Sequence, residues 1–96
     1  MGVALIKSFK HKGLEIFFHT GSKKGIQSKH ADKISDILDL IDAAAVVGDV
    51  NFPGADLHPL KPKKDNVWAV RVSGAWRITF KFEDGDAYIL DYLNYH

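Results

Sequence analysis

The pattern of apolar residues predicts a short strand and then a helix at the start of the chain. Ala4–Phe9 is rich in apolar residues and predicts the first strand. Within His11–Thr20, Leu14, Phe17 and Phe18 recur at the three- and four-residue spacing of a helix. Gly21 follows directly, and glycine commonly ends helices because it adopts a left-handed backbone without steric cost. We therefore expect a helix over His11–Thr20.

A second helix is predicted from about Lys29 to Ala45, with Ser28 as its N-cap. One side of this helix carries an apolar stripe, Ile34, Ile37, Leu38 and Ile41. The other side carries an acidic row, Asp32, Asp36 and Asp39. An apolar stripe of this width indicates a face that packs on a core, so we interpret the aspartates as a solvated face rather than a cation site.

The second half of the chain has the alternating pattern of antiparallel strands. Strands are predicted at Leu57–Lys61, Val67–Val72, Trp76–Phe82 and Ala87–Tyr92. Ser73-Gly74 and Asp84-Gly85 are the turn signals between the last three strands, and no internal repeat is present. With 96 residues, the chain fits a single domain, 1–96. We predict an α+β fold, in which two helices from the N-terminal half pack on one face of a small, curved, mostly antiparallel sheet.

Alternation also predicts the register of the first hairpin. Its apolar positions share one face only if the loop is odd or a bulge lies near Ser73. This register pairs Arg71 with Arg77 on the opposite face, where two arginines repel unless an anion lies between them. If Asp84-Gly85 forms a two-residue turn, the cations Arg77 and Lys81 share that face with Tyr88, Leu90 and Tyr92. Such a face suits a phosphate and a base, although lysine and arginine stems covering tyrosines would look the same.

The formal charge of +1 conceals segregated blocks. Residues 1–30 carry six Lys and one Glu, and residues 31–56 carry six Asp and one Lys. Residues 57–81 carry six Lys or Arg and one Asp, and residues 82–96 carry four acids. This segregation predicts a basic surface opposite an acidic one, and basic surfaces attract nucleic acid. The alternative, that these charges only solvate helices and turns, stays open.

Composition also bears on the cellular location of the protein and on the kinds of site that it can form. No apolar run is long enough to span a bilayer, and the opening residues lack the cationic start of a secretory signal, so we expect a cytoplasmic protein. The chain has no cysteine, which excludes disulfides and thiolate metal sites. No metal-ligand spacing joins the five histidines, so no metal and no cofactor is expected. His11, His19 and His30 are interpreted as surface or helix-end residues.

The remaining histidines belong to a set of groups suited to cleaving RNA. That reaction needs a group that removes a proton from the 2′-hydroxyl, a group that protonates the departing 5′-oxygen, and fixed positive charge for the phosphate. The chain offers His58 with Lys61, Arg77 on the sheet, and Tyr95-His96 at its end. Taken singly, His58 also fits a core or capping histidine and the last two residues a frayed end. The predicted pairing, however, brings the tail close to Arg77.

Four segments, in this order and spacing, resemble the HigB toxins of the RelE/ParE superfamily: residues 6–14, Leu57–Lys61, Trp76–Phe80 and residues 83–96. The resemblance implies a RelE-like fold and a bacterial toxin that cuts messenger RNA in the ribosomal A site. It also implies a helix-turn-helix antitoxin partner, with operator DNA reached only through that antitoxin and no membrane involved. The implied reaction is metal-independent attack of the 2′-hydroxyl on its own phosphate.

Carried onto this sequence, the resemblance implies a catalytic set of five residues: His58, Lys61, Arg77, Tyr95 and His96. The two histidines are expected to act as acid and base, Lys61 and Arg77 as cations, and the tyrosine as a stacking ring. We expect further RNA contacts at Arg71, Lys63, Lys64, Lys81, Tyr92 and Asn94. Lysines expected to face the ribosome are Lys7, Lys10, Lys12, Lys23, Lys24, Lys63 and Lys64.

One departure from the family pattern affects activity. Asn94 stands where the family pattern has an aspartate, and an amide cannot take up a proton. Asp91 is expected on the other face of the strand and would then not replace it. Two other functions therefore remain open: a non-enzymatic toxin that blocks a topoisomerase, and a catalytically weakened RNA-binding module.

Overall fold

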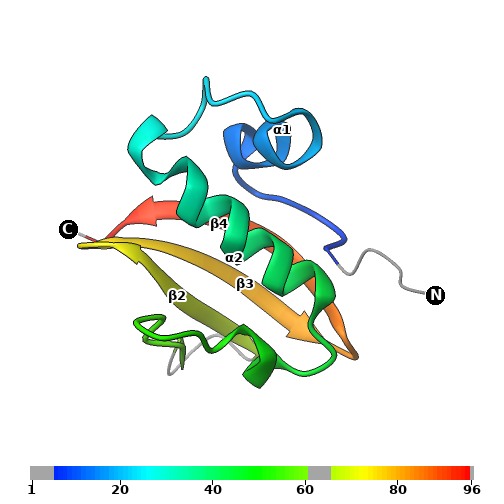
Figure 1. Ribbon diagram of the computed structural model, residues 1–96. Coiled ribbons are helices and arrows are strands. Elements are labelled where there is room, and N and C mark those ends of the chain that lie inside the picture. The colour runs from blue at the N-terminus through cyan, green and yellow to red at the C-terminus, as the bar shows by residue number, and fades with distance from the viewer. Residues whose placement is uncertain (1–5, 61–65, 96) are drawn as a thin grey trace.

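The computed structural model describes residues 6–60 and 66–95. Two α-helices, α1 (Lys12–Thr20) and α2 (Ala31–Ala43), alternate with two short 3₁₀ helices, η1 (Ser28–His30) and η2 (Val47–Val50). Four strands follow: β1 (His58–Pro59), β2 (Val67–Ser73), β3 (Trp76–Glu83) and β4 (Asp86–Asn94). They form one antiparallel sheet in the order β1-β2-β3-β4, and Figure 1 shows α2 lying across one of its faces. The α+β prediction is confirmed.

Helix α1 has the ends that the sequence predicts. The Nδ1 atom of His11, the N-cap, accepts a hydrogen bond of 3.0 Å from the backbone N–H of Leu14. Gly21 ends the helix with φ at 81°, a left-handed conformation that favours glycine. The strand predicted at Ala4–Phe9 is not a regular strand in its described part. Only Ile6 and Phe9 pair with β4 there, through isolated parallel bridges.

Helix α2 is confirmed, but its start is not. Ser28 is not its N-cap, because residues 28–30 form the 3₁₀ turn η1 and His30 occupies the cap position of α2. The helix ends at Ala43 rather than Ala45. Its predicted faces are correct, since the apolar stripe is buried and Asp32, Asp36 and Asp39 are exposed.

The first hairpin has the predicted register. Arg71 pairs with Arg77, and the pairing then shifts at a bulge before Ser73, as the alternation requires. The predicted strand Leu57–Lys61 is regular only at His58–Pro59, and Lys61 lies outside the described residues.

The second hairpin departs from the prediction after its turn. Asp84-Gly85 is a two-residue turn and Lys81 pairs with Tyr88, but a second bulge then shifts the register. Ile89, at this bulge, has φ of 48°, and its N–H donates a 2.8 Å hydrogen bond to Ser8 Oγ. Beyond it, Tyr92 pairs with Ile78. The expectation that Leu90 and Tyr92 share the Arg77 face is therefore wrong, because one extra residue reverses the alternation.

The hydrophobic core lies between the helices and one face of the sheet. It joins the buried side of α2 to apolar residues of β2, β3 and β4: Ile34, Ile37, Leu38, Ile41, Val70, Val72, Ile78, Phe80, Leu90 and Tyr92. Fully burying an aliphatic or aromatic side chain of this kind contributes about 1.5–3 kcal/mol. The two helices thus occupy one face of the sheet and leave the other uncovered. Among the described residues, no helix is long and apolar enough to cross a membrane.

Candidate functional site

The face of the sheet opposite the helices, which we call the open face, collects side chains from all four strands. His58 pairs with Ala69, Ala69 with Thr79, and Thr79 with Asp91. Residues paired in register point to the same side of a sheet, so these four form one row across it. The neighbouring row contains Arg71 and Arg77, together with Leu93 of β4.

The guanidinium of Arg77 is held at the end of the open face by backbone carbonyls. Its Nη1 donates hydrogen bonds of 2.7 Å to Gly74 O and 3.1 Å to Trp76 O. Its Cζ lies 5.8 Å from the centre of the Tyr95 ring. Its Nε is buried and has no hydrogen-bond partner within the described part of the chain. Arg77 is thus a positioned cation with donor capacity left over.

Tyr95 lies where the tail was predicted to lie, beside the turn between β2 and β3. Its backbone N–H donates a 2.9 Å hydrogen bond to Ala75 O, and 44% of the residue is exposed. An exposed ring beside an arginine can stack on a base while the cation contacts a phosphate. His96 lies outside the described residues, as do Lys61, Lys63 and Lys64.

His58 contributes an imidazole of fixed tautomer. Its Nδ1 lies 2.7 Å from Asp56 O, and because a carbonyl oxygen only accepts, Nδ1 carries the proton and donates it. In the neutral ring, Nε2 is then the nitrogen that accepts a proton. Asp56 adopts φ of 50° in presenting that carbonyl. Two strand spacings, about 10 Å, separate the β1 and β3 backbones, and His58 lies one row of the sheet from Arg77 on the same face.

The open face also contains a hollow of ≈ 200 Å³. It is lined by Lys10, Leu60, Val67, Thr79, Ile89, Asp91, Leu93 and Tyr95. Asp91 reaches it because of the second bulge, so the expectation that Asp91 lies on the other face is wrong. Its Oδ1 accepts a 2.9 Å hydrogen bond from the Tyr92 N–H, and its Oδ2 lies 3.8 Å from Lys10 Nζ.

Sequence reasoning missed this hollow, and alternation alone does not reveal it. Residues 87–90 are all apolar or aromatic, so the pattern does not show which of them face the core. Beyond the bulge, the register assigns Asp91 to the open face.

The other predicted cations of the open face are in place. Arg71 is exposed opposite Arg77. Lys81 lies further along β3, with Nζ 3.6 Å from Glu83 Oε2. The carboxylate offsets part of that charge, so Arg71 and Arg77 are the stronger attraction for a phosphate.

Tyr92 lies on the helix side, and the expectation that it contacts RNA from the cationic face is wrong. It is 5% exposed and stacks on Trp76 with ring centres 4.7 Å apart. Its hydroxyl lies 2.6 Å from Nδ1 of His30, which lies at a helix end, one of the two places expected for it, but is only 4% exposed. Burial, and to a lesser degree Lys29, lowers the pKa of His30, while burial raises that of Tyr92.

Asn94 also lies away from Arg77. It pairs with Trp76 and lines a separate hollow with His11 and Tyr92, which places it on the helix side. An aspartate at this position would therefore not face Arg77.

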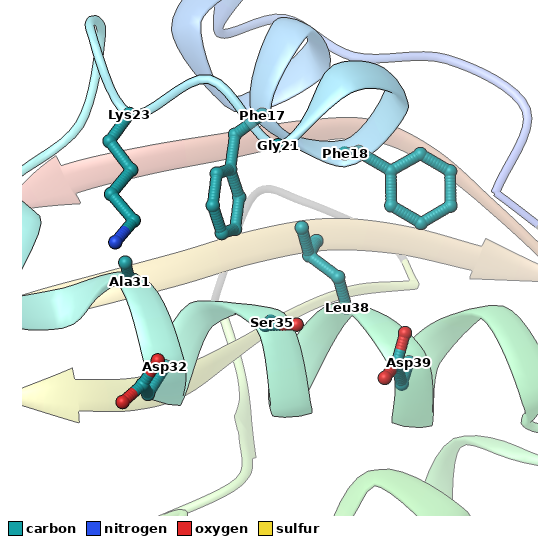
Figure 2. Close-up of a pocket in the computed structure, with 9 residues that line it drawn as sticks. All are labelled: Phe17, Phe18, Gly21, Lys23, Ala31, Asp32, Ser35, Leu38 and Asp39. Carbon is teal, nitrogen blue, oxygen red and sulfur yellow. The ribbon is translucent and has the colours of Figure 1, made fainter.

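A further hollow, of ≈ 390 Å³, lies between α1 and α2 (Figure 2). Phe17 and Phe18 reach toward α2 from one side, and Asp32 and Asp39 lie on the other. None of the described residues predicted to be catalytic lines it. Within residues 6–60 and 66–95, no cluster of three histidine or carboxylate side chains could hold a metal ion.

Comparison with known proteins assigns the chain to a family. Residues 7–96 match the family model described as the RelE-like toxin of the type II toxin-antitoxin system HigB. The chain is also 47% identical over 92 residues to a Proteus vulgaris protein named endoribonuclease HigB, an alignment that covers 96% of this chain and 100% of that protein.

Proposed function

Because the chain belongs to the HigB-like family of RelE-like toxins of type II toxin-antitoxin systems, we propose that it is an endoribonuclease that cuts messenger RNA in the ribosomal A site. A type II toxin has a protein antitoxin as its partner. We propose that this antitoxin carries a helix-turn-helix domain and alone connects the toxin to operator DNA. The site of action is the cytoplasm, where translating ribosomes are found.

The observation that carries this proposal is the shared face of His58, Arg77 and Tyr95. A proton acceptor and a positioned cation are two of the groups that RNA cleavage requires, and an exposed ring can stack on a base. All three lie on the side of the sheet that the helices leave free, so an RNA strand reaches them without displacing the core.

In the proposed reaction, the RNA supplies its own nucleophile. A general base takes the proton of a ribose 2′-hydroxyl, and the 2′-oxygen attacks the adjacent phosphorus. The bond from phosphorus to the 5′-oxygen breaks, and a general acid protonates that oxygen. The products are a 2′,3′-cyclic phosphate and a free 5′-hydroxyl. No metal and no cofactor takes part in this scheme.

We assign roles as follows. His58 and His96 serve as the acid and the base, and Nε2 is the nitrogen of His58 that exchanges the proton. Arg77 and Lys61 stabilise the negative charge on phosphorus in the transition state. Stacking on an aromatic ring such as that of Tyr95 is worth about 1–3 kcal/mol per base, enough to orient a nucleotide.

Binding to the ribosome and the message is proposed to be largely electrostatic. Cations of the open face and of residues 61–65 contact phosphates: Arg71, Lys63, Lys64 and Lys81. Five lysines of the N-terminal part face ribosomal RNA: Lys7, Lys10, Lys12, Lys23 and Lys24. Each phosphate contact releases a counterion, so binding weakens steeply as salt rises.

The test is to induce the chain in cells and to map messenger RNA ends. Wild type is compared with His58→Ala, Lys61→Ala, Arg77→Ala and a version that lacks His96. Lys29→Gln, an exposed change on η1, is the control. We expect growth arrest with new 5′-hydroxyl ends within codons, and both are lost in the four site variants but not in the control.

Other results would overturn this function. Growth arrest that persists in all four variants would remove the catalytic role of these residues. Arrest accompanied by DNA damage, without new RNA ends, would indicate a toxin that blocks a topoisomerase. RNA binding without any cleavage by wild type would indicate the catalytically weakened module.

A further inference from the structure

The hollow beside Asp91 presents an acidic group on the open face, where the proposed function places RNA phosphates. Asp91 lies in the row of His58 and Thr79, one row from the two arginines. A carboxylate repels a phosphate, so this group does not serve to hold the RNA backbone. Its presence calls for another explanation.

A structural explanation based on Lys10 is insufficient. Lys10 Nζ lies 3.8 Å from Asp91 Oδ2, and the lysine side chain is 72% exposed. An ion pair of this length and exposure contributes little to stability. The hydrogen bond from Tyr92 N–H to Oδ1 does satisfy a backbone donor near the bulge, but an amide oxygen serves there equally well. The hydrogen bond needs no negative charge, and the ion pair is too long and too exposed to explain that charge by its contribution to stability.

The surroundings of Asp91 fit a heterocyclic base. The hollow measures ≈ 200 Å³, and its other lining residues are largely apolar: Leu60, Val67, Ile89 and Leu93. Tyr95 borders it and presents an exposed ring. Lys10 also lines it, and an exposed ammonium group of this kind can contact a phosphate. Apolar walls for the faces of a base, with one polar group for its edge, are the usual features of a selective pocket.

We infer that this hollow is a base subsite in which Asp91 selects bases that carry an exocyclic amino group. Adenine, cytosine and guanine offer such a group to the carboxylate, as Asp and Glu accept from the amino group of cytosine in DNA. Uracil offers only carbonyl oxygens and one ring N–H between them, and the carboxylate repels those oxygens. The inference rests on the proposed function for its biological meaning, because it names which messages the site prefers.

Asp91→Asn is the informative variant. The amide keeps an oxygen for the Tyr92 N–H, so the fold is retained, but it also gains a donor that uracil accepts. Asp84→Asn is the matched control, since it makes the same chemical change at the exposed turn between β3 and β4. Lys10→Gln separates the two roles: it should lower the rate for all messages equally and leave base preference unchanged.

The experiment measures cleavage on ribosomes programmed with messages that differ at one A-site base. We expect one position of the A-site codon to show the preference. With adenine, cytosine or guanine at that position, wild type and Asp84→Asn should cut the message about tenfold faster than with uracil, as expected of one good polar contact. Asp91→Asn should reduce that ratio to about twofold or less while its melting temperature stays at the wild-type value. Equal cleavage of all four bases by wild type, or an unchanged ratio in Asp91→Asn, would overturn the inference.

A binding measurement keeps this inference separate from the function. Nuclear magnetic resonance titrations with adenosine, cytidine, guanosine and uridine 3′-monophosphates report on the amides of Asp91 and Leu93 without any cleavage. Selective shifts with the first three, lost in Asp91→Asn, would support the subsite even if the chain cut no message. Shifts of equal size with uridine 3′-monophosphate would contradict it.

Discussion

Arg71 and Arg77 lie directly opposite each other on β2 and β3, on the face that the helices leave free. Like charges paired across a sheet destabilise it by about 0.2–1 kcal/mol, so this pair does not serve the fold. We propose that a phosphate binds between the two side chains, and the carbonyls of Gly74 and Trp76 hold the Arg77 guanidinium.

Arg71→Gln should therefore affect stability and binding in opposite directions. We expect the free energy of unfolding to stay constant or rise by up to about 1 kcal/mol, because a repulsion is removed. Binding of a 2′-O-methyl RNA oligonucleotide, which cannot be cut, should weaken, and the slope of log affinity against log salt should fall by about one. Lys29→Gln, which removes a charge on the helix side, should leave that slope unchanged. A large loss of stability in Arg71→Gln would show that the pair has a structural role.

The buried pair of His30 and Tyr92 predicts a pH dependence of stability. Burial lowers the pKa of His30 below its ordinary value of 6.5, so the unfolded chain takes up the proton first as pH falls. Stability is fully present above pH 6.5 and is lost below it, by at most about 1.4 kcal/mol per pH unit.

Chemical unfolding between pH 7.5 and 5 tests this prediction. His30→Asn, which keeps a side-chain acceptor near Tyr92, should lose less stability over this range than wild type. His19→Asn changes an exposed histidine of α1 and should follow the wild-type curve. Parallel curves for wild type and His30→Asn would show that His30 does not carry the effect.

The second bulge predicts unequal effects at two adjacent residues. Ile89 has φ of 48° and is 48% exposed, whereas Leu90 is fully buried. Ile89→Gly relieves the strain of a left-handed backbone, about 1–2 kcal/mol. The greater chain entropy of glycine and the lost side-chain contacts roughly offset this gain, so the free energy of unfolding should change little. Leu90→Ala should lower the free energy of unfolding by about 2–5 kcal/mol because it leaves a cavity. Denaturant unfolding of both variants tests this, and an equally large loss in Ile89→Gly would contradict the described backbone.

A close backbone approach makes substitution of Gly13 unfavourable although this residue lies in a helix. A Cβ atom there would lie 2.6 Å from Gly25 O, so the two backbone segments would have to separate. Gly13→Ala should therefore cost about 1–3 kcal/mol, despite the better helix propensity of alanine. At Gly48, a Cβ would meet nothing within 4 Å, and Gly48→Ala should be neutral or stabilising by up to about 1 kcal/mol. Thermal unfolding distinguishes the two, and equal melting temperatures would contradict the prediction.

The sequence predicts what depends on local pattern. Alternation predicts the pairing of Arg71 with Arg77 together with either an odd loop or a bulge near Ser73, since any other register exposes the apolar face, and the structure has the bulge. The second bulge depends on a distant contact, the hydrogen bond from Ile89 N–H to Ser8 Oγ, which no local pattern contains. This single displacement decides the faces of Tyr92 and Asp91.

His30 shows the same limit in the helical half. A histidine at a helix end predicts a solvated side chain, but η1 directs His30 toward Trp76 and Tyr92, and only the packed structure shows that partner. The proximity of His96 and Lys61 to His58 stays a prediction, since both residues lie outside the described parts of the chain.

The central claim is that RNA is bound and cut on the open face. Single-turnover cleavage of one ribosome-bound message by wild type, Arg77→Gln and Lys29→Gln tests it most directly. Loss of a positioned charge at the reacting phosphate should slow Arg77→Gln by about 100-fold or more, while Lys29→Gln stays within about threefold of wild type. Cleavage by Arg77→Gln at the wild-type rate, with the melting temperature unchanged, would contradict the account.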